Sequence, residues 1–145
     1  MPAEARFGMR NVTLWIAQVL LALFFGLAGY SHTFVPIAEL AQGPAGWTGD
    51  VPVALVRFIG VAELLGALGL VLPRITGVAR FLTPLAAMGV GLIMLFAIPF
   101  HIARGEASVI WMHSIALAVA AFVTWGRWPD LAERPHLRSG LAARS

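Results

Sequence analysis

Three ionisable side chains lie inside segments of this sequence that are otherwise apolar. Glu63 falls near the centre of the run 53–72, Arg57 lies six positions earlier in that run, and His113 lies inside the run 107–125. A charge at the centre of a bilayer costs about 2.5–3.5 kcal/mol on insertion scales, so such a group normally faces a protein partner or a water-filled cavity. We therefore predict that these three residues form the catalytic group of a site.

Four apolar runs supply the elements that must position these residues. Each run has the length of about 20 residues that a membrane crossing requires. Charged residues make up 12% of the chain, against about 25% in soluble domains. The sequence predicts an all-α integral membrane four-helix bundle in residues 1–126, followed by a polar cytoplasmic tail in residues 127–145. The spans are expected at residues 11–30, 53–72, 81–100 and 107–125, with Pro73 ending the second span.

The arginines predict how the bundle lies in the membrane. Arg104 is the one arginine in the loops on one side, whereas eight of the ten arginines flank the spans on the side that carries both termini. By the positive-inside rule, both termini are expected to be cytoplasmic. The first run is longer than the 7–15 apolar residues of a signal peptide, so we expect it to be a retained helix.

This orientation brings most of the polar residues to the outer half of the bundle. His32 and His101 follow the outer ends of the first and third runs, His113 lies about two turns inside the fourth, and Arg104 lies in an outer loop. Gln18 lies midway along the first run. We predict one polar site opening to the extracytoplasmic side, with His32, His101, Arg104 and Gln18 as its binding residues.

Structural roles are the alternative for the same residues. Glu63 can hold two helices together by a hydrogen bond, and Arg57 can extend its guanidinium to the outer headgroups. His32 and His101 suit the membrane interface as well as they suit a ligand. These alternatives stay open at the level of sequence.

Of the candidate cofactors, a quinone requires the fewest specific residues for its binding site. It requires a His or Arg donor for a carbonyl oxygen, a carboxylate that exchanges protons, and apolar walls. Haem b or a metal ion has less support, because no spacing motif brings the histidines together, and no metal ligand is predicted. The chain contains no cysteine, which removes disulfide relays, thiolate nucleophiles and cysteine-ligated iron–sulfur clusters. The cofactor therefore stays unassigned.

Three stretches of the chain resemble the DoxX-like family of membrane proteins. They are Phe24–Tyr30, Arg57–Pro73 and Pro99–Glu106. The most specific parts are the Gly-x2-Glu-x2-Gly pattern around Glu63 and the His-x2-Arg-Gly-Glu turn that begins at His101.

The resemblance covers all four spans and implies a small four-helix protein of the bacterial cytoplasmic (inner) membrane. Some relatives are associated with quinone-linked oxidoreductases. The family pattern points to Glu63, His101 and Arg104, and more loosely to Arg57. Many relatives have a lysine near the end of the first span, where this chain has His32.

Three functions follow from these observations. The first is a small membrane subunit of a quinone-linked oxidoreductase system. The second is a non-catalytic structural or assembly subunit, and the third, with least support, is a small proton-coupled transporter, because no inverted repeat is apparent. Membrane lipids are expected partners, together with a protein of a redox complex or a second copy of the chain. Nucleic acid is not expected, because the arginines are spread around the spans. Whether the protein is itself an enzyme stays open.

Overall fold

Helices form all the regular structure of the described part of the chain. The structure is a computed structural model in which residues 3–131 are described, with side chains from residue 8 onward. The long helices are α1 (Ala3–Phe34), α3 (Val53–Thr76), α4 (Leu82–Ala103) and α5 (Ala107–Arg127). Three short helices join or follow them: α2 (Ile37–Leu40), η1 (Gly46–Gly49) and η2 (Trp128–Leu131).

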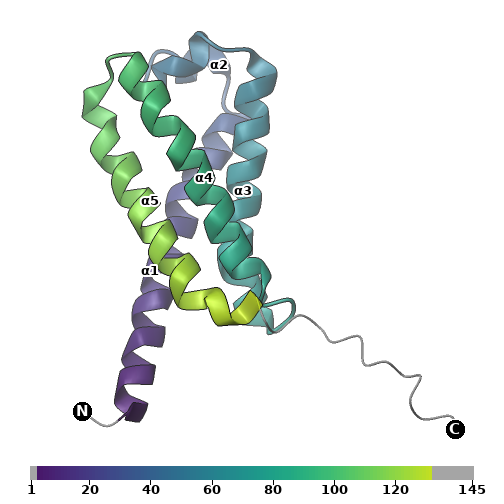
Figure 1. Ribbon diagram of the computed structural model, residues 1–145. Coiled ribbons are helices and arrows are strands. Elements are labelled where there is room, and N and C mark those ends of the chain that lie inside the picture. The colour runs from purple at the N-terminus through teal and green to yellow at the C-terminus, as the bar shows by residue number, and fades with distance from the viewer. Residues whose placement is uncertain (1–2, 132–145) are drawn as a thin grey trace, which may run out of the picture.

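The four long helices form an elongated bundle. The start of α1 and η2 lie at one end, here called the terminal end, and α2 lies at the opposite, distal end (Figure 1). The helices are long and apolar enough to cross a membrane. The prediction of an all-α, multi-pass membrane bundle is therefore confirmed.

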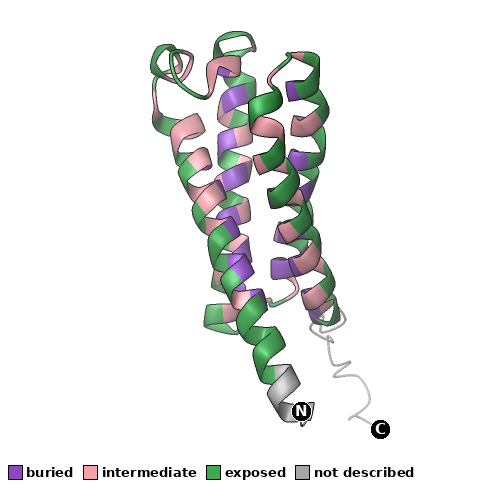
Figure 2. Ribbon diagram, turned by 90° about the vertical axis from the view of Figure 1, so that its left-hand side faces the viewer, coloured by how far each residue is buried: buried purple, intermediate pink, exposed green. Residues whose placement is uncertain are grey.

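Each helix buries a narrow stripe of residues in the core and exposes apolar side chains on its outer face. Phe25, Leu70 and Val123 are fully buried, and the buried residues follow the inner faces of the helices (Figure 2). By contrast, Leu27 and Phe58 are each 71% exposed. In a bilayer these outer side chains face lipid, while the helical backbone satisfies its own hydrogen bonds.

Small residues let the helices approach closely. A Cβ atom added to Gly29 of α1 would lie 2.8 Å from the carbonyl oxygen of Gly60 in α3. On the other side of the bundle, a Cβ atom on Gly91 of α4 would lie 3.5 Å from the Cβ of Ala120 in α5. This packing through small residues is typical of membrane helices.

The second span continues past its predicted end. Pro73 lies inside α3, which continues to Thr76. A proline there removes one backbone hydrogen bond but does not prevent one more turn. The helix ends instead at Gly77, whose φ of 73° is the left-handed conformation that closes many helices.

The last helix also continues beyond the predicted domain boundary at residue 126. α5 ends at Arg127, and η2 then packs against both α4 and α5. Asp130 of η2 is buried and forms an ion pair with Arg74, which ties η2 to the end of α3. The rest of the predicted tail, residues 132–145, lies outside the described residues.

Candidate functional site

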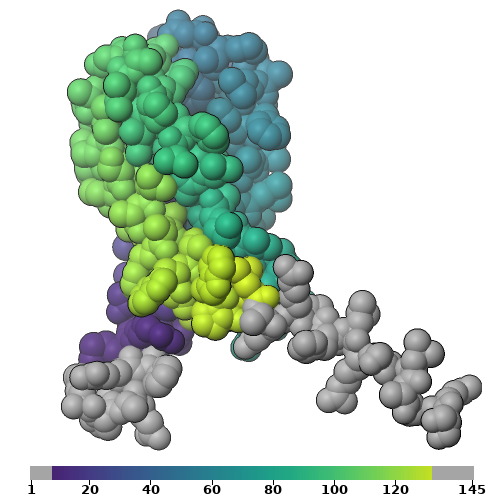
Figure 3. Space-filling view, in the orientation of Figure 1, coloured from purple at the N-terminus to yellow at the C-terminus, as the bar shows by residue number. Residues whose placement is uncertain are grey.

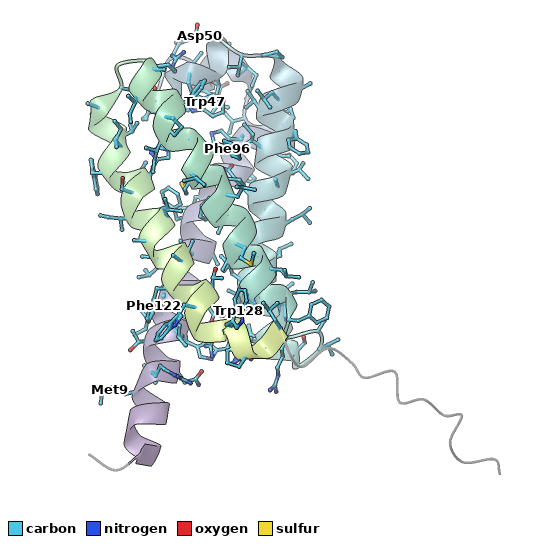
Figure 4. The ribbon with its side chains drawn as sticks, viewed as in Figure 1. Met9, Trp47, Asp50, Phe96, Phe122 and Trp128 are labelled. Atoms are coloured by element: carbon cyan, nitrogen blue, oxygen red, sulfur yellow. The ribbon has the colours of Figure 1, made fainter. Side chains whose placement is uncertain are left out.

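A pocket of about 320 Å³ lies at the distal end of the bundle. Its walls are mainly apolar side chains of α3 and α4, and Trp47 of η1 lies above Phe96, closer to the distal end (Figure 4). Four polar side chains also line it, from α1, α3, α4 and α5. They are His32, Glu63, His101 and His113.

A short polar contact between two lining residues joins α1 to α3. Nδ1 of His32 lies 2.7 Å from Oε2 of Glu63, and Glu63 is only 4% exposed. The close approach of the helices at Gly29 creates this contact, because a side chain at that position would meet Cβ of Glu63 at 3.0 Å. A hydrogen bond between a histidine and a carboxylate is stronger than a neutral one when either group is charged.

The other two polar side chains of the lining are histidines, one from α4 and one from α5. The ring centroids of His101 and His113 are 4.6 Å apart. Nδ1 of His101 donates to Oε2 of Glu106 at 2.5 Å, and Nδ1 of His113 donates to the carbonyl oxygen of Val109 at 2.7 Å. Because a carbonyl only accepts, the neutral ring of His113 has its acceptor at Nε2.

All three histidines of the pocket share one arrangement. In His32, His101 and His113 it is Nδ1 that binds a protein oxygen. No described residue hydrogen-bonds to their Nε2 atoms. Nε2 is therefore the nitrogen through which each ring can bind a ligand.

Aromatic contacts and ion pairs lie at the distal end of the bundle, next to the pocket. The Trp47 ring lies 5.3 Å from that of His32 and 6.0 Å from that of Phe100. Arg104 binds Asp50 at 2.8 Å and Glu106 at 2.9 Å. This arginine therefore links the segment before α3 to the turn between α4 and α5.

The same contacts set the charge states outside the spans. The hydrogen bond from His101 is the main cause that lowers the pKa of the Glu106 carboxyl, with a further contribution from Arg104. Partial burial opposes the shift. Hydrogen bonds to Asp50 and Glu106 raise the pKa of Arg104. Both groups are therefore charged at neutral pH.

Arg57 does not line the pocket. Its Nη1 donates to the carbonyl oxygens of His32 and Val35, at 2.8 and 2.9 Å. These carbonyls belong to the end of α1, where the helix cannot satisfy them itself. Arg57 thus holds the backbone of His32 at the end of α1.

Gln18 lies apart from the other predicted binding residues. It precedes His32 by fourteen positions, a rise of about 21 Å along α1. It is fully buried, where Nε2 donates to the carbonyl oxygen of Leu70 at 2.6 Å and Oε1 accepts from Nε of Arg127 at 2.7 Å. The prediction of a single polar site thus needs correction, since a second polar cluster lies toward the terminal end.

The burial of Arg127 has no signal in the sequence. An arginine just after a span is typical of the inner membrane surface, and its position favours that interpretation. Its amide partners Gln18 and Asn11 lie more than 100 positions away. Only the packing of α1 against α5 brings them together.

The pocket lining suits an organic ligand better than a metal ion. No group of three His, Cys, Asp or Glu side chains in the described part of the chain could hold a metal. The rings of His101 and His113 contact one another directly, which leaves no space for a haem iron between them.

A comparison with family models supplies the identity of the fold. The model of the DoxX-like family matches residues 16–123, which include all four lining residues His32, Glu63, His101 and His113. The chain belongs to the DoxX-like family. The resemblance seen in its span motifs is thereby confirmed. Comparisons of this DoxX-like protein with curated proteins and with solved structures find no match.

Proposed function

We propose that this DoxX-like protein is a small membrane subunit of a quinone-linked oxidoreductase system, and that its distal pocket binds the quinone headgroup. The supporting observation is the 2.7 Å contact between His32 and Glu63 on the wall of an otherwise apolar pocket of about 320 Å³. Apolar walls with a few convergent polar groups are typical of small-molecule sites.

The histidine nitrogens suit both oxidation states of such a ligand. Nε2 of a protonated His32 donates to a quinone carbonyl oxygen, and Nε2 of the neutral ring accepts from a quinol hydroxyl. A proton gained at Nε2 is balanced by transfer of the Nδ1 proton to Glu63. A histidine ring can carry a proton on either nitrogen, which suits this exchange. In this proposal the electrons pass to or from a protein partner.

The exposure of the pocket wall supports a ligand with an apolar tail. Leu55 of α3 and Phe96 of α4 line the pocket and are also 45% and 67% exposed on the outer surface. The pocket therefore reaches the surface that faces lipid, where an isoprenoid tail can remain. With the orientation predicted by the arginines, the headgroup lies on the extracytoplasmic side of the bacterial inner membrane.

Binding of a short-chain quinone to the purified protein in detergent tests the proposal. We expect saturable binding, followed by tryptophan fluorescence because Trp47 lines the pocket. Glu63→Gln removes the proton acceptor and should weaken binding about tenfold or more, the usual effect of losing a hydrogen bond to a charged group. A measurement of the quinone, haem and metal that co-purify with the protein shows independently whether it holds a cofactor.

Glu39→Gln is the matched control, because Glu39 is exposed in α2 and does not line the pocket. It makes the same change of charge at the same end of the bundle and should leave binding unchanged. Equal binding by the Glu63→Gln protein, or no binding by the unmodified protein, would contradict the proposal.

A structural or assembly subunit is the second candidate. The contacts of Arg57 favour it, because this partly buried cation serves the end of α1 and not the pocket. In that case Glu63→Gln lowers thermal stability or the retention of a co-purified protein, and no quinone binds to either form.

A further inference from the structure

Two of the three pocket histidines are bound to groups that cannot pass a proton on to water. Nδ1 of His113 is bound to the carbonyl oxygen of Val109, which accepts a hydrogen bond but does not take up the proton. Nδ1 of His32 is bound to Glu63, whose side chain is only 5% exposed. A proton that reaches either ring therefore stays inside the bundle.

His101 differs because its ring connects the pocket to the surface. The ring lines the pocket and is buried, and its Nε2 has no hydrogen-bond partner among the described residues. Its Nδ1 donates to Oε2 of Glu106 at 2.5 Å. The side chain of Glu106 is 31% exposed. One nitrogen of this ring can thus meet a ligand while the other is bound to a carboxylate within reach of water.

The backbone of the turn after α4 places Glu106 beside His101. The N–H of Gly105 donates to the carbonyl oxygen of Ile102 at 3.0 Å, and the N–H of Glu106 donates to that of His101 at 2.9 Å. This pair of bonds closes many helices and requires the left-handed conformation that Gly105 adopts, with φ 72°. The His-x2-Arg-Gly-Glu motif therefore builds the contact by itself.

The groups around this pair favour release of a proton from Glu106. Hydrogen bonds from His101 and then from Arg104 lower the pKa of the Glu106 carboxyl, so it is a stronger acid than an ordinary glutamate. Figure 3 shows the turn (green) beside the segment before α3 (blue) at the distal surface. Among the described residues, the other titratable or charged groups of this turn, of that segment and of the pocket lining are Arg104, Asp50, His113, His32 and Glu63.

The other opening of the pocket gives a proton no acceptor. Leu55 and Phe96 line the pocket and are exposed on the outer surface, which faces lipid. The hydrocarbon core of a bilayer holds no water that could take up a proton. A proton exchanged with a ligand in the pocket therefore needs a route through side chains.

We propose that His101 and Glu106 form the proton route between the distal pocket and water. When a bound quinol is oxidised, one hydroxyl O–H bond breaks and its proton passes to Nε2 of His101. The Nδ1 proton of the same ring passes to the Glu106 carboxylate and from there to water. The second hydroxyl proton goes to His32 and Glu63, and the two electrons go to the protein partner. Reduction of a quinone reverses each transfer. This inference rests on the quinone function proposed above and adds the path of the released proton.

Rapid mixing of the purified protein, loaded with a short-chain quinol, with ferricyanide tests the route. Ferricyanide takes the two electrons, and a pH-indicator dye reports the protons that reach water. Glu106→Gln should slow proton release about tenfold or more, because an amide takes up no proton. Quinone affinity should stay unchanged, since Glu106 does not line the pocket. Added imidazole, which carries protons by diffusion, should restore the rate.

Two further variants complete the test. Glu39→Gln makes the same change of charge at an exposed position of the distal end and should release protons at the normal rate. His101→Gln keeps a donor for Glu106 but lacks a second ring nitrogen, so it should show the same slow release. This variant keeps the route testable if the Glu106→Gln protein does not fold.

Three results would overturn the proton route. Normal proton release by the Glu106→Gln or His101→Gln protein, with quinone still bound, contradicts the route and leaves the proposed function intact. Slow release by the Glu106→Gln protein that imidazole does not restore would make Glu106 a structural residue only. If the unmodified protein binds no quinone, the proposed function fails and the route fails with it.

Discussion

At the scale of single residues, the chemistry of the pocket depends on contacts made outside it. The backbone of His32 is held by Arg57, and the ring of His101 is held by Glu106. These contacts fix the side of each ring that binds the protein. A ligand therefore meets nitrogen atoms that are already oriented, which lowers the entropy lost on binding.

Gly29→Ala tests the contact that brings His32 to Glu63. The new Cβ atom would lie 2.8 Å from backbone atoms of Gly60 and Leu64, which cannot move away as a side chain can. We expect α1 and α3 to separate, with a loss of about 1–3 kcal/mol in the free energy of unfolding and weaker quinone binding. Denaturant unfolding in detergent and the binding assay measure the two effects.

Gly89→Ala is the control for that substitution. Nothing lies within 4 Å of a Cβ atom at Gly89, so its stability should be unchanged or slightly higher. If Gly29→Ala and Gly89→Ala proteins are equally stable, the close contact between α1 and α3 is wrong.

Arg57→Met tests the role of the partly buried arginine. The substitution keeps an apolar chain of similar length but leaves the carbonyl oxygens of His32 and Val35 without this donor. We expect the free energy of unfolding to fall by about 1–3 kcal/mol. Arg80→Met, at an exposed loop position, should change it much less. A stable Arg57→Met protein that no longer binds quinone would instead place Arg57 in direct contact with the ligand.

At the scale of elements, the turn between α4 and α5 should make stability depend on pH. The pKa of Glu106 is lowered in the folded state, first by the hydrogen bond from His101. The stabilisation is therefore complete above the ordinary glutamate pKa of about 4.3 and is lost as the pH falls through the lowered value. Melting temperatures measured from about pH 6 to pH 3 should fall over that range.

Glu106→Gln should remove part of this dependence on pH. Glu39→Gln should keep it, because Glu39 is exposed in α2 and takes no part in the contact between Glu106 and His101. An equal fall in melting temperature for the Glu106→Gln protein would assign the dependence to another acid.

Hydropathy identifies the elements from the sequence but not their ends or lateral contacts. The four spans follow from apolar length, whereas the end of α3 depends on the conformation of Gly77 and not on Pro73. Glu63 is identifiable because a charge in an apolar run is rare. Its contact with His32 depends on the rotation of α1 against α3, and the pairing of Gln18 with Arg127 depends on packing across the bundle. Neither rotation nor packing can be derived from hydropathy.

At the scale of the whole molecule, the placement of the two ends relative to the membrane is open to direct measurement. The start of α1 and η2 lie at the same end of the bundle (Figure 1). The chain has no cysteine, so single-cysteine variants can be labelled without background. With the orientation that the arginines predict, Glu39→Cys should react with a membrane-impermeant maleimide in intact cells, and Ser145→Cys only after the membrane is opened. The reverse pattern would place the quinone pocket on the cytoplasmic side.

The exposure of Phe96 beside the pocket determines which ligand concentration matters. A compound that enters between α3 and α4 arrives from the lipid phase, not from water. Its occupancy then depends on its mole fraction in the bilayer, and a compound that partitions strongly into membranes can fill the pocket even when its intrinsic affinity is weak. Affinities for this protein should therefore be compared at a fixed ratio of ligand to lipid, because ranking by aqueous concentration would mainly rank hydrophobicity.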